Sequence, residues 1–127
     1  MSVKLEHVNV TVSDPEATAA MLCALFEWKI RWRGPAQSGG HTIHVGLEHE
    51  YLALYSPAEP GAPRPPNANR KGRPLNHVGV VVPDLQAIEA RVRTAGMAPF
   101  GHGDYEPGRR FYFLDRDGIE FEVVSYS

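Results

Sequence analysis

The sequence has little of several features, and each shortage excludes a class of protein. A single cysteine, Cys23, rules out an internal disulfide, and no Cys-x-x-Cys or His-Glu-x-x-His run is present to bind structural or protease zinc. No apolar run approaches the roughly 20 residues that span a bilayer, and the N-terminus has no apolar segment typical of a secretory signal. The formal net charge of -2, with both signs mixed, argues against nucleic-acid or membrane-surface partners. We therefore expect a cytoplasmic protein with a small-molecule substrate.

What the sequence does have is an internal repeat. Residues 5–14 (Leu-Glu-His-Val-Asn-Val-Thr-Val-Ser-Asp) recur seventy positions later at 75–84 (Leu-Asn-His-Val-Gly-Val-Val-Val-Pro-Asp), with six of ten positions identical, including His7 and His77. Valines two apart in both copies predict strands with one buried face, so both histidines point to the other face. If the two copies pair about a pseudo-twofold axis, both imidazoles reach the same side of the sheet.

The 127 residues are expected to form one domain of two β-α-β-β-β modules, about 1–56 and 75–127, joined by a Pro/Arg-rich linker, 57–74. In the first module, Ser13 and Glu16 form a capping box for a helix to about Trp28. Asp84 caps the second helix, and Gly96 follows its end. The expected strands after these helices are 29–32, 41–45 and 51–55, then 98–101, 109–114 and 119–125, with 34–40 as a loop.

This order predicts an α+β fold in which eight strands form an open, barrel-like sheet with the helices on one side. A twisted sheet of that size curls, so its uncovered face becomes a concave cup. In the last strand, Phe121 and Val123 belong under the helices, which turns Glu122 to the side of the histidines. Two imidazoles and one carboxylate are the ligands of a 2-His-1-carboxylate site. Each residue alone fits an ordinary hydrogen-bonded strand residue equally well, but core packing gives no reason for the histidine to recur.

At these residues the chain resembles the vicinal oxygen chelate superfamily, which includes glyoxalase I, extradiol dioxygenases, fosfomycin-resistance thiol transferases and bleomycin-resistance proteins. The resemblance rests on the two histidine motifs above and on residues 111–118 (Phe-Tyr-Phe-Leu-Asp-Arg-Asp-Gly) followed by Glu122, with Arg116 where proline is usual. It implies a divalent metal on His7, His77 and Glu122 within an open barrel of two modules.

The ligand count departs from the four-ligand members of that superfamily. Aligning 51–55 with 120–124 puts Ala53 opposite Glu122, and alanine does not bind metal. The remaining trio resembles the ligand sets of the dioxygenases and thiol transferases, unless a one-residue slip brings His49 or Glu50 to the fourth position. Fe(II) is the metal expected for a dioxygenase-like enzyme acting on a substrate with vicinal oxygens. Mn, Ni or Zn, a glyoxalase-like lyase or isomerase, a thiol transferase and a non-catalytic drug-binding protein stay open.

Six further residues are expected around the metal. The cup-facing Tyr112 and Glu120 are the candidate catalytic residues, although Tyr112 may equally be a packed wall residue and Glu120 a solvated strand end. The candidate substrate-binding residues are His41, Tyr51, His102 and Arg110. Paired arginines beside a loop glycine are more often solvated, which is the alternative for Arg110. Because superfamily members often pair, we expect a homodimer.

Overall fold

The structure is a computed structural model, and it describes residues 2–36, 39–58, 75–105 and 108–126. The chain forms two compact units, residues 1–63 and 64–127, and each is described by itself. The predicted linker, 57–74, lies outside the described residues from position 59 onward. None of the helices in the described part of the chain has the length and apolar character needed to cross a membrane.

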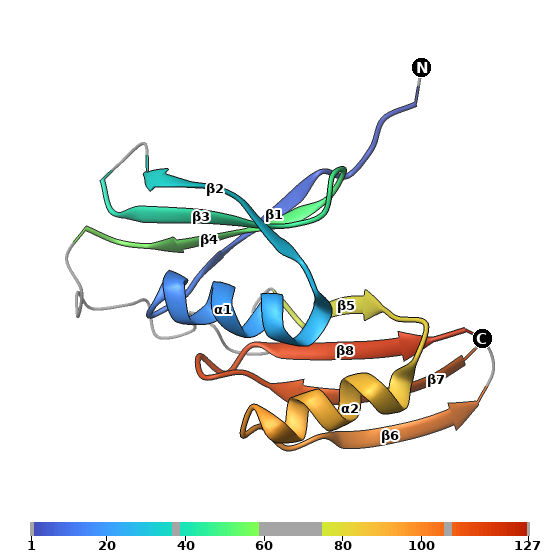
Figure 1. Ribbon diagram of the computed structural model, residues 1–127. Coiled ribbons are helices and arrows are strands. Elements are labelled where there is room, and N and C mark those ends of the chain that lie inside the picture. Colours follow the sequence, from blue (N-terminus) through green and yellow to red (C-terminus); the bar gives the residue numbers. More distant parts are fainter. Residues whose placement is uncertain (1, 37–38, 59–74, 106–107, 127) are drawn as a thin grey trace. The chain divides into compact units, whose positions relative to one another are not determined.

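The first unit is a four-stranded sheet with one helix packed on it (Figure 1). Its elements are β1 (His7–Thr11), α1 (Pro15–Phe26), β2 (Lys29–Pro35), β3 (His41–Gly46) and β4 (Tyr51–Ser56). The strands follow the order β1-β4-β3-β2, with β1 parallel to β4 and the other pairs antiparallel. Helix α1 packs mainly on β3 and β4, where Leu22 and Leu25 bury against Ile43 and Leu54. The other face of the sheet is free of the helix.

The second unit repeats this arrangement. Its elements are β5 (Val78–Val81), α2 (Leu85–Thr94), β6 (Phe100–Tyr105), β7 (Gly108–Leu114) and β8 (Glu120–Ser125). The strand order β5-β8-β7-β6 reproduces that of the first unit, again with one parallel and two antiparallel pairs. The α+β fold with two β-α-β-β-β modules is therefore confirmed. Within the described residues the eight strands form two four-stranded sheets, and no barrel is closed.

The helix starts show one error and one success of the sequence reading. Asp14, not Ser13, is the N-cap of α1: its carboxylate accepts the backbone N–H of Ala17 at 3.2 Å, and Pro15 follows in the first turn. The predicted capping box is thus wrong, because the cap lies one residue later. In the second unit Asp84 accepts the N–H of Ala87 at 3.1 Å, as predicted.

Two strand boundaries also differ from the prediction. Gly34 and Pro35 were expected in a loop but close β2, where they pair with Thr42 and His41. Strand β6 begins at Phe100, two residues later than expected, because its pairing with β7 is irregular between Phe100 and Gly103. Gly96 has a φ of 91°, as the prediction of a left-handed residue after the helix requires.

Candidate functional site

The strand registers make positions of the two modules equivalent. Asn9 pairs with Ala53 between β1 and β4, and Gly79 pairs with Glu122 between β5 and β8. Ala53 therefore occupies in the first module the position of Glu122 in the second. His49 and Glu50 precede β4 in an exposed turn, so the alternative register that would bring either of them to this position is wrong.

In the second module, His77 and two carboxylates meet on the face of the sheet away from α2. His77 directly precedes β5, and its Nε2 lies 3.0 Å from Oε1 of Glu122, while its Nδ1 lies 3.7 Å from Oε2 of Glu120. Glu120 is only 6% exposed, so the alternative of a solvated strand end is wrong. Side chains alternate along β8, so Glu120 and Glu122 lie beside the imidazole, whereas Phe121 and Val123 point into the core on the other face.

Arg110 completes this cluster from the neighbouring strand β7. Its Nη1 donates to Oε2 of Glu122 at 2.8 Å, and the two side chains are 14% and 13% exposed. The alternative of a solvated arginine is therefore wrong. Both charges are largely shielded from water. Loss of either partner would leave an uncompensated buried charge, which is energetically costly. The second oxygen of Glu122 is thus engaged, and its first oxygen faces His77.

Tyr112 forms the wall beside His77. The two rings meet edge to face with 5.9 Å between their centroids, and the Phe100 ring lies 6.0 Å from Tyr112 on another side. Gly101, at a φ of 67°, lets the strand pass under the phenol ring, since a Cβ there would lie 2.8 Å from that ring. Tyr112 therefore packs as a wall residue does, and a catalytic role for its phenol group stays a prediction.

In the first module, His7 belongs to a stack of rings. Its imidazole lies 4.9 Å from the ring of Tyr51, and His44 stacks on Tyr51 at 4.5 Å. Nδ1 of His7 lies 2.8 Å from Oε1 of Glu6. A carboxylate only accepts, so Nδ1 of His7 donates this hydrogen bond.

Charges around the Tyr51 ring shift three pKa values. Hydrogen bonding from His7, with a further contribution from Tyr51, lowers the pKa of the Glu6 carboxyl. Burial, assisted by the Glu6 charge, raises the pKa of Tyr51, and burial lowers the pKa of His44, which favours its neutral form. The guanidinium of Arg31 lies 4.3 Å from the centre of the Tyr51 ring as a cation–π contact. Tyr51 stacks with His7 and His44, and its expected role in substrate binding stays a prediction.

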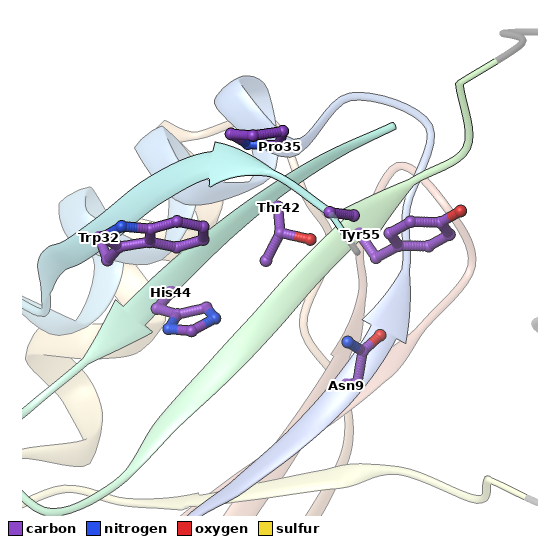
Figure 2. A pocket seen from close by; sticks show the side chains of 7 residues that line it. Asn9, Trp32, Pro35, Thr42, His44 and Tyr55 are labelled. Atoms are coloured by element: carbon purple, nitrogen blue, oxygen red, sulfur yellow. The ribbon is translucent and has the colours of Figure 1, made fainter. Parts of the chain in front are cut away.

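The same face of the first module has an open hollow of about 480 Å³ (Figure 2). Trp32, His44 and Thr42 point into it from β2 and β3, and Tyr55 and Asn9 flank it from β4 and β1. The residues that line it are Asn9, Trp32, Pro35, Ala36, Thr42, His44 and Tyr55. Within the described part of the chain, this lining includes no Asp, Glu, Lys or Arg.

Two of the expected substrate-binding residues lie elsewhere. His41 shares its strand face with Ile43 and Val45, under α1, and its Nε2 lies 3.3 Å from Oε2 of Glu16 at the start of that helix. His102 stacks on Phe111, in the core under α2. The expectation that both flank the cup is wrong, because strand alternation turns them to the helix-covered faces.

His102 instead anchors the helix of its own module. Its Nε2 lies 2.9 Å from Oε2 of Glu89 in α2, and Arg93 donates to the same oxygen at 2.8 Å. Burial alone raises the pKa of Glu89, but the hydrogen bonds from His102 and Arg93 outweigh it and leave the pKa lowered.

The donor chemistry of the predicted metal ligands fits a divalent ion. No group of three or more His, Cys, Asp or Glu side chains forms a metal site within the residues that the structure describes. His77 and Glu122 nevertheless present two donor atoms 3.0 Å apart, the separation of roughly 3 Å expected for neighbouring ligands with bonds of about 2.1 Å at a right angle. In the first module, Glu6 engages Nδ1 of His7, so Nε2 is the ring nitrogen that would bind a metal.

Sequence reasoning missed two contributors. Glu6 as the partner of His7 and Arg110 as the partner of Glu122 were not singled out for these roles. The parity of β7 contained a signal for Arg110, since it shares a face with Tyr112. Glu6 carried none, because the partner of a carboxylate is defined by side-chain placement.

Comparison with known proteins supports the fold and its family. The model of the Glyoxalase/Bleomycin resistance protein/Dioxygenase superfamily matches residues 4–123. No curated protein matches the chain.

Solved structures with the same fold share little sequence with it. A glyoxylase/bleomycin resistance protein/dioxygenase domain from Frankia sp. EAN1pec is 21% identical, with a TM-score of 0.80 and full coverage of both chains (100% and 100%). The fosfomycin resistance protein FosX from Listeria monocytogenes is 18% identical (TM-score 0.73; 100% of this chain, 96% of that one). TnmS3, an antibiotic binding protein from Streptomyces sp. CB03234, is 21% identical (TM-score 0.71; 100% and 99%). With its repeated modules and nearly full-length match, the chain belongs to the Glyoxalase/Bleomycin resistance protein/Dioxygenase superfamily.

Proposed function

We propose that the protein is a divalent-metal-dependent enzyme that acts on a small substrate with vicinal oxygens, with His7, His77 and Glu122 as the metal ligands. The observation that carries the proposal is the pair of donor atoms of His77 and Glu122, 3.0 Å apart on the helix-free face of the second module. The repeat puts His7 at the equivalent position of the first module. Dioxygenase-like chemistry is favoured because the equivalent of Glu122 in the first module is Ala53.

The surrounding side chains support this assignment. A metal-binding histidine ordinarily donates its other ring nitrogen to a carboxylate, which orients the ring. Glu6 stands in that relation to Nδ1 of His7 at 2.8 Å, and Glu120 lies 3.7 Å from Nδ1 of His77. We therefore assign Glu120 as a positioning residue rather than a base. Arg110 holds Oε2 of Glu122, which leaves Oε1 to bind the metal through one oxygen.

His7, His77 and Glu122 would hold the divalent ion, which would polarise the substrate oxygens and orient the reactants. The chain itself supplies the walls and the proton control. Tyr112, edge-on to His77, is proposed to donate a hydrogen bond to a substrate oxygen.

Metal binding by histidine variants tests the ligand assignment. His7→Ala and His77→Ala should each lower the affinity for Mn²⁺ or Fe²⁺ by more than about 100-fold, since loss of a ligand costs more than loss of its supporting group. His41→Ala and His102→Ala are matched controls, one histidine from each module on the helix-covered face, and should change affinity less than threefold. Affinity is measured by competition with a chelator and metal content by mass spectrometry. Equal losses of metal affinity in all four variants would contradict the assignment of His7 and His77 as metal ligands.

The reaction class has a separate test. Protein loaded with Fe(II) should consume oxygen in the presence of catechol, and Tyr112→Phe should lower that rate while leaving the metal affinity unchanged. Stoichiometric iron without oxygen uptake on a panel of catechols would reject dioxygenase chemistry and favour a lyase or transferase with the same ligands.

A second candidate function is binding of a small molecule without catalysis. The open hollow favours it, because its aromatic lining in the first module needs no metal to accept a ligand. Protein that holds no metal after loading with Fe, Mn, Ni or Zn, yet binds an aromatic ligand, would support this candidate over the enzyme.

We also propose that the protein works as a homodimer. Superfamily members bind small molecules and often form dimers. Light scattering behind a sizing column should give twice the mass of one chain, and the mass of one chain at micromolar concentration would reject the dimer.

A further inference from the structure

We infer that the hollow of the first module binds an uncharged, planar aromatic molecule that stacks on the indole of Trp32. The inference rests on the proposed function for the role of that molecule as the substrate, and it names the class to which the substrate belongs. The binding itself involves the first module alone.

The placement of Trp32 is the first observation. Trp32 is 48% exposed, although tryptophan is normally among the more buried residues. The indole points into the hollow with its ring centre 5.1 Å from that of His44 (Figure 2). An aromatic face held open over a cavity offers the stacking surface that a planar ligand needs.

The strand beneath is shaped to hold the indole there. Pairing of β2 with β3 shifts register between Ile30 and Trp32, which turns the tryptophan onto the open face. Gly34 follows two residues later, and a Cβ at this position would lie 2.7 Å from the six-membered ring of Trp32. The glycine therefore leaves room for the indole to lie flat along the strand, which no core packing explains.

The chemistry of the lining selects an uncharged ligand. Asn9, Thr42 and His44 offer hydrogen bonds, and within the described residues no charged side chain lines the hollow. The two arginines that flank Trp32 in the sequence are both engaged elsewhere. Arg31 lies on the Tyr51 ring at 4.3 Å, and Arg33 pairs with Glu16 at 3.2 Å. A charged ligand would lose water in the hollow without gaining a partner of opposite charge, which is unfavourable.

The size of the hollow agrees with this class of ligand. A volume of about 480 Å³ falls in the range of roughly 300–1,000 Å³ found for small-molecule sites. A ligand with one aromatic ring, or with two fused rings, would stack on Trp32 with Tyr55 alongside. A hydroxyl group on the ligand would then lie near Asn9 or Thr42.

Binding of 2-naphthol tests the inference, since this probe is planar and uncharged and its single oxygen does not chelate a metal. Calorimetry on the full chain should give a Kd below about 1 mM, and Trp32→Ala should weaken binding at least about tenfold. Trp28→Phe, which changes the tryptophan packed on Phe26, should stay within twofold of the wild type. In a proton–nitrogen NMR spectrum, 2-naphthol should shift the indole signal of Trp32 and leave that of Trp28 in place.

A second variant and a charged probe separate stacking from folding. Gly34→Ala adds a methyl group against the indole and should weaken 2-naphthol binding while the circular dichroism spectrum and the melting temperature stay near those of the wild type. The anion 2-naphthalenesulfonate should bind at least about tenfold more weakly than 2-naphthol. Equal or tighter binding of the anion, no binding of 2-naphthol, or an unchanged Kd in Trp32→Ala would overturn the inference.

The test is run on chelator-treated and on metal-loaded protein. Binding of 2-naphthol with no metal uptake would retain the hollow and reject the proposed enzyme. Metal uptake that depends on His7 and His77, with no binding of 2-naphthol, would retain the enzyme and reject the aromatic substrate.

Discussion

At two pairs of equivalent positions, the first module carries Thr42 and Ala53 where the second carries Arg110 and Glu122. The scaffold around these positions is the same in both modules: the strand order, the register of β1, β3 and β4 against that of β5, β7 and β8, and the capped helix. The side chains on the open face differ in kind, since the first module presents a hydroxyl and a methyl group and the second an ion pair. Duplication of the fold therefore conserved the backbone while the chemistry of the two faces diverged.

A second pair of positions extends the contrast. Trp32 pairs with His44 across β2 and β3 as Phe100 pairs with Tyr112 across β6 and β7. The indole lies over a hollow, whereas the similarly exposed ring of Phe100 lies beside Tyr112. At these positions the described part of the first module presents uncharged side chains over a hollow, and the second module presents a desolvated ion pair beside an aromatic pair. The two open faces therefore differ in charge although the strands beneath them are equivalent.

The largest expected effect is on stability, at the ion pair. Arg110→Ala should lower the free energy of unfolding by about 3 kcal/mol, because it leaves the Glu122 charge out of water with one partner fewer. Thr42→Ala, at the equivalent position, should lower it by no more than about 1 kcal/mol. Urea titrations of both variants measure the difference.

The double variant Arg110→Met with Glu122→Gln is the control for this interpretation. It should recover more than half of the loss, since both charges are removed together. Equal losses for Arg110→Ala and Thr42→Ala would contradict the contrast between the modules.

The helix caps, in contrast to the ion pair, are expected to stabilise the two modules equally. Asp14→Ala and Asp84→Ala should each lower the free energy of unfolding by about 1 kcal/mol, because each removes the acceptor for one N–H in the first turn. The losses should add in the double variant, because the two caps share no hydrogen-bond partner. Ser13→Ala is the matched control and should cost less than half as much as Asp14→Ala in the same thermal or urea measurement. Unequal cap losses would show that the shared scaffold is not equally stable in both modules.

The smallest effect concerns pH and the helix-side histidines. The pKa of Glu89 is lowered in the folded protein below the ordinary value of 4.5, so its ionised form stabilises the fold above that pH, and this contribution is lost as pH falls through the folded pKa. The stability difference between wild type and Glu89→Gln should therefore be below about 1 kcal/mol at pH 7 and should shrink between pH 4.5 and pH 3.

Glu16→Gln provides the comparison in the first module. The His41 and Glu16 side chains are 40% and 55% exposed, so solvent screens their interaction more than that of Glu89. Melting temperatures at several pH values should show a smaller difference for Glu16→Gln. A larger effect there than at Glu89 would contradict the order that exposure predicts.

Much of the fold was predictable because repeated local signals agree. Valines at every second position defined the strands, and a seventy-residue offset defined two modules. Alternation in β8 correctly placed Glu122 and Glu120 on the face of His77, since side-chain direction has a period of two once a strand is identified.

The errors came where small shifts or long-range contacts decide. His41 shares the parity of Ile43, so the alternation of its strand already turned it toward the helix. His102 was misplaced because β6 is irregular and begins later than the pattern indicates. The parity of β7 indicates the face of Arg110, but its partnership with Glu122 depends on the register between β7 and β8, which the local pattern does not give.

The amino-acid order by itself determined that this protein is a doubled β-α-β-β-β fold and which side of each strand faces the helices, because both follow from hydrophobic periodicity within a few residues. Only the tertiary structure decided that Glu122 is shared by His77 and Arg110 and that Trp32 stands open over an uncharged hollow. Those features depend on register between strands, on a shift in the β2–β3 pairing and on the burial of charge, which are properties of side chains brought together from distant positions.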